Sequence, residues 1–321
     1  MNKVLVAAAL ATVLQCAGTV MTARAGQPLV AVFTSNFTIP GYAAARRGAD
    51  LVAAETGAAI RHFVPGEPDN VEQQKALVAE ALIIKPDLVL FVPVDDKAMV
   101  EDVKKFTDAG IPVVSFVNRL EGTFVSHVGS DDVAVGYNGT KALIESLGGK
   151  GKILAVEGNP AAPTSRDRVE GMRKAVAEYP EVELLGVVTG MYQEKDAHDV
   201  TAAALLKHPQ IDGIWAANDV MVYGSLAALE EAGRTATIVG ANGLDKAIQL
   251  IEEGKMLATV EFSAFKIACT AARAGMRQLA GEDVPAEITI PSVLIDRSNL
   301  SGWKVPLEKR ACPTWNEVVA P

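Results

Sequence analysis

The feature of this sequence that most restricts its fold is a regular alternation of short apolar runs with longer amphipathic segments. Seven runs have the length of a strand, namely LVAVF, LVLFVPV, IPVVSFV, GKILAVEG, VELLGVV, IDGIWAA and ATIVGA. Eight segments with helical periodicity lie between them, at 41–56, 71–84, 98–109, 133–147, 166–178, 196–207, 220–232 and 246–253. Continuously apolar strands separated by helices are typical of parallel sheets that are covered on both faces. The sequence therefore predicts an α/β protein with doubly wound parallel sheets.

The N-terminus and the length of the chain predict an exported protein of two domains. The first residues carry one basic side chain, Lys3, and are followed by an apolar run and by Ala23-Arg24-Ala25. This pattern is typical of a secretory signal peptide, which we expect to be cleaved after Ala25. The alternative is an uncleaved membrane anchor, for which the apolar run is slightly short. The remaining residues exceed one comfortable hydrophobic core, so two domains are expected.

Charge and cysteine content restrict the partners further. The chain has 30 basic and 39 acidic residues and a net charge of −9. Such an acidic balance argues against nucleic acid and anionic membrane surfaces as partners. The two cysteines beyond the signal peptide, Cys269 and Cys312, form either a disulfide or two separate thiols, because an exported compartment permits both. No His or Cys spacing suggests a metal site, and no cofactor is expected.

The common motifs of α/β enzymes are missing from the sequence. No G-x-G-x-x-G follows a strand, and neither G-x-x-x-x-G-K-[ST] nor G-x-S-x-G occurs. Ser126 and His127 are adjacent on an expected strand, so their side chains point to opposite faces and do not form a nucleophile–base pair. An enzyme is therefore the less favoured hypothesis, although missing motifs alone do not exclude one.

Polar and aromatic residues instead follow the carboxyl ends of the expected strands, where open α/β sheets bind ligands. These residues are Tyr42 in the loop SNFTIPGY, Asn118 and Arg119 after IPVVSFV, Arg166 after GKILAVEG, Tyr192 after VELLGVV, Asn218 after IDGIWAA and Asn242 after ATIVGA. Amide and guanidinium groups can donate to or accept from vicinal hydroxyls, and aromatic rings offer an apolar face to the C–H side of a sugar. The set predicts a binding site for a neutral polyhydroxy molecule.

Several longer stretches together resemble a known family. They are IPVVSFVNR, VSHVGSDDVAVGYNGTKAL, EGNPAAPTSRDRVEGMRKAV, IWAANDVMVYGSLAALEEAG and IVGANGLDKAIQLIEEGKMLATV. From Pro28 to about Asp296 the chain resembles the periplasmic solute-binding proteins of sugar ABC transporters, which are grouped with the ribose-binding protein and the LacI-type repressor cores. The repressor branch is not expected here, because no helix-turn-helix precedes the first strand.

The resemblance implies two lobes of one fold, joined by three crossovers near residues 130–131, 262–263 and 290–291. One lobe would comprise 26–129 with 263–290, and the other 130–262 with 291–321. The ligand would lie between the lobes, which would close around it by bending at a hinge that includes Ser130 and Asp131. The resemblance also implies a monomer in the periplasm that delivers its ligand to a membrane permease.

The sequence departs from the ribose-type pattern at several of its implied ligand residues. Tyr42 matches a stacking aromatic residue, and Arg119, Arg166 and Asn218 match the pattern, whereas Asn118 and Asn242 replace aspartates, Tyr192 replaces Phe, Ile39 and Val92 replace asparagines, and Phe262 replaces Gln. We therefore expect a smaller, more apolar and less negative site than one for a hexose. A small neutral sugar or polyol is favoured; a sugar acid paired with Arg119 and Arg166 is the alternative ligand.

Overall fold

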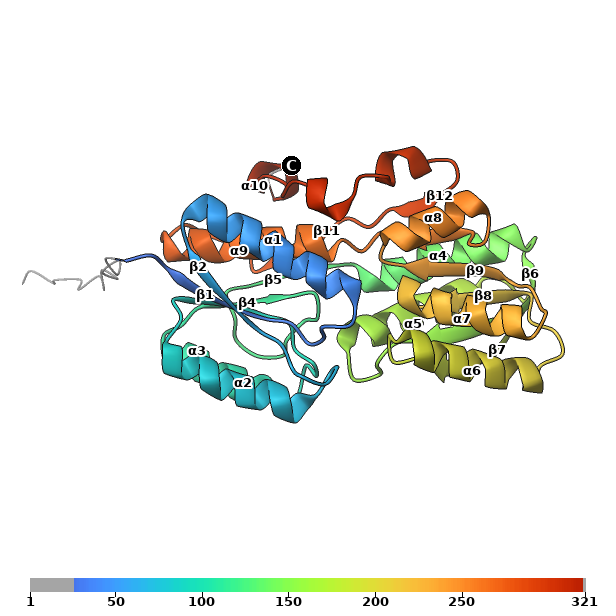
Figure 1. The fold of residues 1–321 in the computed structure, drawn as a ribbon, viewed down its shortest axis with the longest axis horizontal. Helices are drawn as coiled ribbons and strands as arrows, with labels where there is room; N and C mark the ends of the chain where they lie inside the picture. The colour runs from blue at the N-terminus through green and yellow to red at the C-terminus, as the bar shows by residue number, and fades with distance from the viewer. Residues whose placement is uncertain (1–25, 320–321) are drawn as a thin grey trace, which may run out of the picture.

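The computed structural model describes residues 26–319 of the 321-residue chain, so the expected signal peptide and its cleavage site lie outside the described residues. The described chain forms two lobes, and each lobe is built on a six-stranded sheet with helices on its faces (Figure 1). The strand order is β11-β5-β4-β3-β1-β2 in the first sheet and β12-β10-β9-β8-β6-β7 in the second. The predicted doubly wound α/β architecture is confirmed.

The first sheet contains β1 (Leu29–Phe33), β2 (Ala59–Phe63), β3 (Leu88–Phe91), β4 (Val113–Phe116), β5 (Ser126–Ser130) and β11 (Glu287–Ile290). The second contains β6 (Lys150–Glu157), β7 (Glu181–Thr189), β8 (Gly213–Ala216), β9 (Thr237–Ala241), β10 (Ala258–Val260) and β12 (Leu294–Asp296). The helices are α1 (Pro40–Thr56), α2 (Val71–Ile84), α3 (Val100–Asp108), α4 (Asp132–Ser146), α5 (Pro163–Ala177), α6 (Glu194–Lys207), α7 (Asp219–Glu231), α8 (Asp245–Glu253), α9 (Ala264–Leu279) and α10 (Trp315–Val318), with short 3₁₀ turns η1 (Leu300–Trp303) and η2 (Leu307–Lys309).

The strands pair in parallel, as predicted, with one exception at the edge of the second sheet. There β12 pairs antiparallel with β10, because the chain returns from the first lobe in the opposite direction. In the first sheet the parallel register places Phe33 beside both Phe63 and Phe91. Their ring centroids lie 4.8 and 4.9 Å from that of Phe33, so the register itself brings three aromatic side chains into one core cluster.

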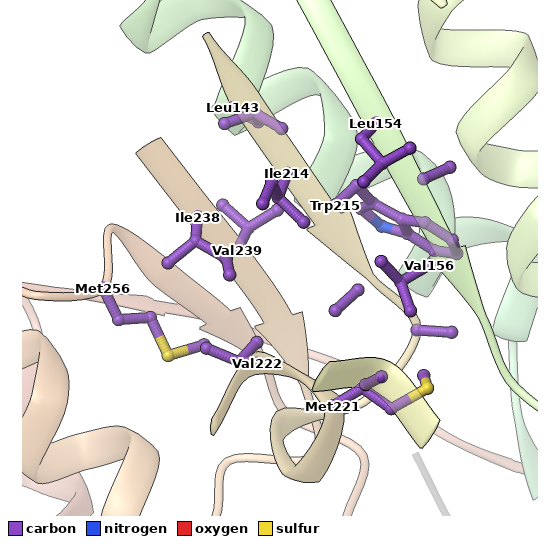
Figure 2. Close-up of a cluster of buried hydrophobic side chains, with 14 of the residues drawn as sticks. Leu143, Leu154, Val156, Ile214, Trp215, Met221, Val222, Ile238, Val239 and Met256 are labelled. Carbon is purple, nitrogen blue, oxygen red and sulfur yellow. The ribbon is translucent and has the colours of Figure 1, made fainter. Parts of the chain in front are cut away.

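The second lobe has its own core, which Figure 2 shows around Trp215 of β8. Trp215 is 2% exposed and lies beside Ala155, its register partner on the neighbouring strand β6. Two strands buried on both faces require continuous apolar sequence, which is the pattern that IDGIWAA and GKILAVEG carry. Trp215 therefore belongs to the core of the second lobe.

The sequence analysis did not predict α9, which is among the most buried helices of the structure. It follows β10 of the second sheet, lies in the first lobe, and packs against α1. The two helices approach closely at Gly48, where a Cβ atom would lie 2.6 Å from the carbonyl oxygen of Phe265. Only glycine permits this approach, because any side chain at residue 48 would separate the helices.

The chain passes between the two sheets three times, after β5, after β10 and after β11. Only some of the residues after β12 remain with the second lobe, to which residues 291–321 were expected to belong. β12 and η1 lie against the second lobe, whereas Leu307, Trp315 and Val318 pack on the core of the first lobe. A disulfide joins Cys312 to Cys269 of α9, with 5.6 Å between their Cα atoms. Residues 297–319, here called the C-terminal tail, therefore contact both lobes (Figure 1).

Two helices are followed by a glycine in a left-handed conformation, a common signal for the end of a helix. Gly110 and Gly233, which follow α3 and α7, have φ angles of 75° and 62°. Glycine adopts this left-handed conformation without the steric cost that a side chain would add. No helix within residues 26–319 is both long and apolar enough to cross a membrane.

Candidate ligand-binding site

A pocket of about 310 Å³ lies between the two lobes. The first lobe contributes the beginning of α1, the beginning of α9 and Val117 after β4. The second lobe contributes α5 and the loops that precede α6, α7 and α8. The volume is within the range of pockets that bind small molecules. The carboxyl ends of parallel strands from both sheets therefore meet at one cavity, as the topology predicts.

Six of the ten residues expected to bind the ligand line this pocket. They are Ile39, Tyr42, Tyr192, Asn218, Asn242 and Phe262. Burial raises the pKa of Tyr42 above its usual value, so this residue is a neutral phenol at physiological pH. The other four expected residues lie outside the pocket lining, for the reasons given below.

Arg168 of α5 is the arginine of the pocket, and it is not one of the expected residues. Its Nε donates to Asp132 Oδ1 at 2.7 Å, and its Nη1 donates to the Ala217 carbonyl at 2.6 Å and to Asn242 Oδ1 at 3.2 Å. Its guanidinium carbon lies 4.7 Å from the centroid of the Phe262 ring, a cation–π contact. Nη2 has no hydrogen-bond partner among residues 26–319. The guanidinium is thus fixed in position with one nitrogen available.

Asp132, the first residue of α4, compensates the charge of Arg168. Their side chains are only 5% and 3% exposed. Burial raises the pKa of Asp132 to about 6, while the Arg168 guanidinium acts in the opposite direction and favours the carboxylate. The buried charge of Arg168 is therefore balanced by protein and does not require an anionic ligand.

Asn218 and Asn242 present their amides from two helix-preceding loops. Asn218 is the N-cap of α7, and its Oδ1 accepts from the Met221 backbone N–H at 2.8 Å, which leaves Nδ2 without a partner in the described part of the chain. Asn242 has a φ angle of 120°, an unfavourable conformation for a residue with a side chain. Strain held at this position suggests that the loop is shaped for binding.

Asp219 holds the Asn242 loop in place from behind. Its carboxylate accepts from the Leu244 backbone N–H at 2.9 Å and from the Thr259 hydroxyl at 2.7 Å. The residue is fully buried, and this burial raises the pKa of Asp219 to about 7. The loop between β9 and α8 is therefore fixed by a buried carboxylate that does not itself line the pocket.

Tyr192 packs its ring over the loop that follows β6. A Cβ atom at Gly158 would lie 2.2 Å from the ring, so only glycine leaves room for it. The Tyr192 hydroxyl lies 3.3 Å from Thr164 Oγ1, and both residues line the pocket. Thr164 also donates to Asn118 Oδ1 at 2.9 Å, which links the second lobe to the first.

Two of the expected ligand residues, Asn118 and Val92, do not line the pocket. Asn118 is buried, its Nδ2 donates to the Pro93 carbonyl at 2.9 Å, and its Oδ1 is used by Thr164. Its amide thus connects the lobes beside the pocket. Val92 belongs to the core of the first lobe, is fully buried, and contributes its carbonyl to Gln74 Nε2 at 2.9 Å.

Arg119 and Arg166, also expected in the site, do not line the pocket either. Arg119 is half exposed and forms an ion pair with Glu287 of β11. Arg166 has a side chain that is 43% exposed; its Nη2 donates to Asp96 Oδ2 at 2.7 Å and its Nη1 to the Ala161 carbonyl at 2.7 Å. Asp96 lies in the first lobe, so Arg166 forms an ion pair between the lobes and does not point into the cavity.

The helical phase of α5 decides which of its arginines faces inward. The buried positions of this helix include Thr164, Arg168, Met172 and Ala175, which recur every three to four residues. Arg166 falls on the other side of the helix. The apolar periodicity of this segment therefore indicates that Arg168, and not Arg166, faces the pocket.

The expected hinge residues lie at the first crossover. Ser130 ends β5, and Asp131 caps α4 by accepting from the Ala134 backbone N–H at 2.8 Å. Their position agrees with a hinge, and their role in motion stays a prediction. Within residues 26–319 no group of His, Cys, Asp or Glu side chains is arranged to hold a metal ion.

Comparisons with known proteins agree with this geometry. The sequence matches the family described as periplasmic binding protein domain over residues 30–283. The ribose import binding protein of Escherichia coli (strain K12) is 25% identical over 290 residues, which cover 90% of this chain and 97% of that protein. The xylitol-binding protein of Mycolicibacterium smegmatis is 30% identical over 194 residues, which cover 60% of this chain and 56% of that protein.

Among solved structures, an ABC transporter periplasmic solute-binding protein from Actinobacillus succinogenes with bound D-allose has a TM-score of 0.82 and 28% identity. The match covers 86% of this chain and all of that chain. Two lobes of parallel sheets, a pocket between them and a family match over most of the sequence agree with one another. This chain belongs to the periplasmic binding protein domain family and has the type I periplasmic binding protein fold.

Proposed function

We propose that this protein is the solute-binding component of an ABC importer and that it captures a small sugar or polyol between its lobes. The observation that carries the proposal is the pairing of polar and aromatic groups in one pocket. Arg168, Asn218 and Asn242 converge on a cavity that Tyr42 and Phe262 also line. The relatives reported above are named for ribose or xylitol, or contain D-allose.

The chemistry of the pocket favours a neutral ligand. The open Nη2 of Arg168 and the open Nδ2 of Asn218 are donors for hydroxyl oxygens, and the rings can cover C–H faces. A sugar acid was the alternative ligand because Arg119 and Arg166 were expected in the site. Both arginines lie outside the pocket, and Arg168 already has Asp132 as its counterion. The charge argument for an anionic ligand therefore loses its support.

In this proposal the ligand bridges the lobes and stabilises their contact. Ion pairs and hydrogen bonds already join the lobes beside the pocket, such as Arg166 with Asp96 and Asn118 with Thr164. A ligand held from both sides would add to them and shift the hinge equilibrium toward closure. We further propose that the chain is exported after cleavage at Ala25, acts as a monomer, and releases its ligand unchanged to a membrane permease.

Isothermal titration with D-ribose, D-allose, xylitol and glycerol tests this function. We expect at least one of these compounds to bind, to raise the melting temperature with concentration, and to be recovered unchanged by mass spectrometry. Small-angle scattering should show a smaller radius of gyration on binding. Binding with turnover would contradict a pure transport role, and binding without any compaction would contradict hinge closure.

A matched pair of variants connects the binding to this pocket. Asn242→Gly removes the amide and relieves the unfavourable backbone conformation, so the fold should be retained. We expect it to weaken binding about three- to tenfold, the effect of one or two neutral hydrogen bonds. Asn138→Ala, on the exposed side of α4, should leave the affinity unchanged. Equal affinities of the two variants would place the ligand elsewhere.

A further inference from the structure

The pocket extends beyond the polar groups that would hold a sugar. Its outer part lies between the beginning of α1, the beginning of α9 and the C-terminal tail, and it is here called the outer chamber. Its lining residues are Gly41, Ala44, Tyr223, Ala264, Trp303 and Leu307. They are distinct from Arg168, Asn218 and Asn242, which form the polar part of the same cavity.

The C-terminal tail forms the roof of the outer chamber, and it is held there from both lobes. Arg47 of α1 donates to the carbonyls of Leu307, at 3.3 Å, and of Glu308, at 2.7 Å. Arg310 forms an ion pair with Asp245 of α8 at 2.8 Å, and the disulfide follows two residues later at Cys312. The roof is therefore a fixed part of the pocket wall and not a loose end of the chain.

The wall between α1 and α9 is made of small residues, which leaves the space beside them open. A Cβ atom at Gly41 would lie 3.9 Å from the Cβ of Ala264, an ordinary contact distance. Ala44, one turn further along α1, packs on the same cluster as Leu307. These small residues line the same cavity as Trp303 and Leu307 of the C-terminal tail.

Two of the ionic groups around the outer chamber are paired with opposite charges, and a third lies over an aromatic ring. Arg310 is paired with Asp245, and Glu261 is paired with Lys266 at 2.9 Å. Lys246 lies over the ring of Tyr223, with its Nζ 4.1 Å from the ring centroid. Apart from the Tyr223 hydroxyl, which has no hydrogen-bond partner among the described residues, the surface that remains for a ligand is aliphatic and aromatic. Burying a hydroxyl against such a surface without a partner costs free energy, whereas burying an apolar group is favourable.

We propose that the outer chamber is a second ligand subsite and that the ligand class is a small sugar or polyol that carries an apolar substituent, such as an alkyl or aryl glycoside. The sugar lies in the polar part of the pocket, and the substituent lies under the C-terminal tail against Trp303 and Leu307. This inference rests on the proposed function, since it extends the same site. It also gives the tail a role in selecting the ligand.

The test compares free sugars with their phenyl glycosides by isothermal titration. The probes are D-ribose and phenyl β-D-ribofuranoside, and D-allose and phenyl β-D-allopyranoside. We expect a phenyl glycoside to bind about tenfold or more tightly than its parent sugar, because the ring leaves water for an apolar chamber. Parent sugars that bind while their glycosides bind more weakly or not at all would overturn the inference and leave the proposed function standing. Failure of every probe, free or substituted, would count against both.

Tail variants locate the effect. Trp303→Ala and Leu307→Ala each remove one side chain from the roof, and each should reduce the preference for the glycoside to about threefold or less, while the affinity for the parent sugar changes by less than about twofold. Val305→Ala is the matched control, because Val305 lies between them in the tail but is 46% exposed and does not line the pocket. An unchanged preference in both roof variants would overturn the inference.

Discussion

Arg168 and Asp132 form a buried ion pair that joins α5 to the first residue of α4, directly after the first crossover between the lobes. Their 2.7 Å contact lies beside the pocket, and neither side chain is more than 5% exposed. The same guanidinium contacts the Phe262 ring, and Phe262 lies at the second crossover. One residue therefore links the binding pocket to both segments that connect the lobes after β5 and β10. Substitutions in this pair should therefore change both the stability of the fold and the affinity for the ligand.

The first prediction concerns the cost of breaking this pair. Arg168→Met leaves the Asp132 carboxylate buried without its counterion, and we expect a loss of about 3–5 kcal/mol in the free energy of unfolding at pH 7. Adding Asp132→Leu to the same variant should recover most of that loss, since an apolar pair removes the unpaired charge. Urea denaturation followed by circular dichroism measures both variants. Equal stabilities of the single and double variants would show that the charge is not the cause.

Arg166 provides the second prediction, because its partner Asp96 lies in the other lobe. The Arg166 side chain is 43% exposed, so solvent screens the pair and its loss should cost only about 0.2–1 kcal/mol. Because the pair joins the two lobes, Arg166→Ala should favour the open form and increase the radius of gyration of the unliganded protein. Ligand affinity should fall by less than about tenfold, because Arg166 does not line the pocket. Arg173→Ala, on an exposed turn of the same helix, is the control and should change neither quantity. A loss of all binding in Arg166→Ala would return this residue to the pocket.

The third prediction concerns pH and follows from Asp219. Burial raises the pKa of its carboxyl from the usual 3.8 to about 7, so the folded protein holds this proton more tightly than the unfolded chain does. Stability from this group is complete below pH 3.8 and is lost as pH rises through about 7. Asp219→Asn can keep the bond from Leu244 and still reach the Thr259 hydroxyl. The difference in unfolding free energy between wild type and Asp219→Asn should therefore fall from pH 5 to pH 8, and a constant difference would contradict the argument.

The frame of the fold could be predicted from the sequence because buried parallel strands need unbroken apolar runs. All seven apolar runs are strands of the structure. The strand β2 was missed because it forms the edge of its sheet, where one side is open and polar residues such as Arg61 and His62 are tolerated. The helix α9 was also missed, although its sequence is clearly amphipathic and could have been recognised.

The residues of the site that follow strand ends could be predicted from the sequence, whereas those positioned by contacts between distant segments could not. Asn218, Asn242 and Tyr192 were found because the ends of parallel strands share one edge of a sheet. Asn118 was expected to bind the ligand, but in the structure its amide bonds to Pro93 and Thr164, which no sequence pattern indicates. The tail was expected with the second lobe but also packs on the first, since its position depends on contacts made over more than two hundred residues, such as those of Arg47 with Leu307 and Glu308.

The last prediction concerns the disulfide that anchors the C-terminal tail. Cys269 and Cys312 are 43 residues apart, and in the chain-entropy model a loop of that length stabilises the folded state by up to about 4 kcal/mol. On the second lobe the tail is held by the ion pairs Lys304–Glu252 and Arg310–Asp245, both partly exposed and therefore weak. The variant with both cysteines changed to serine should lose about 2–4 kcal/mol in urea denaturation, and amide hydrogen exchange should increase over residues 307–319 before it does so in either sheet. Wild-type protein under reducing conditions should behave as the variant does. Unchanged exchange in the tail of both samples would show that contacts other than the disulfide hold it over the pocket.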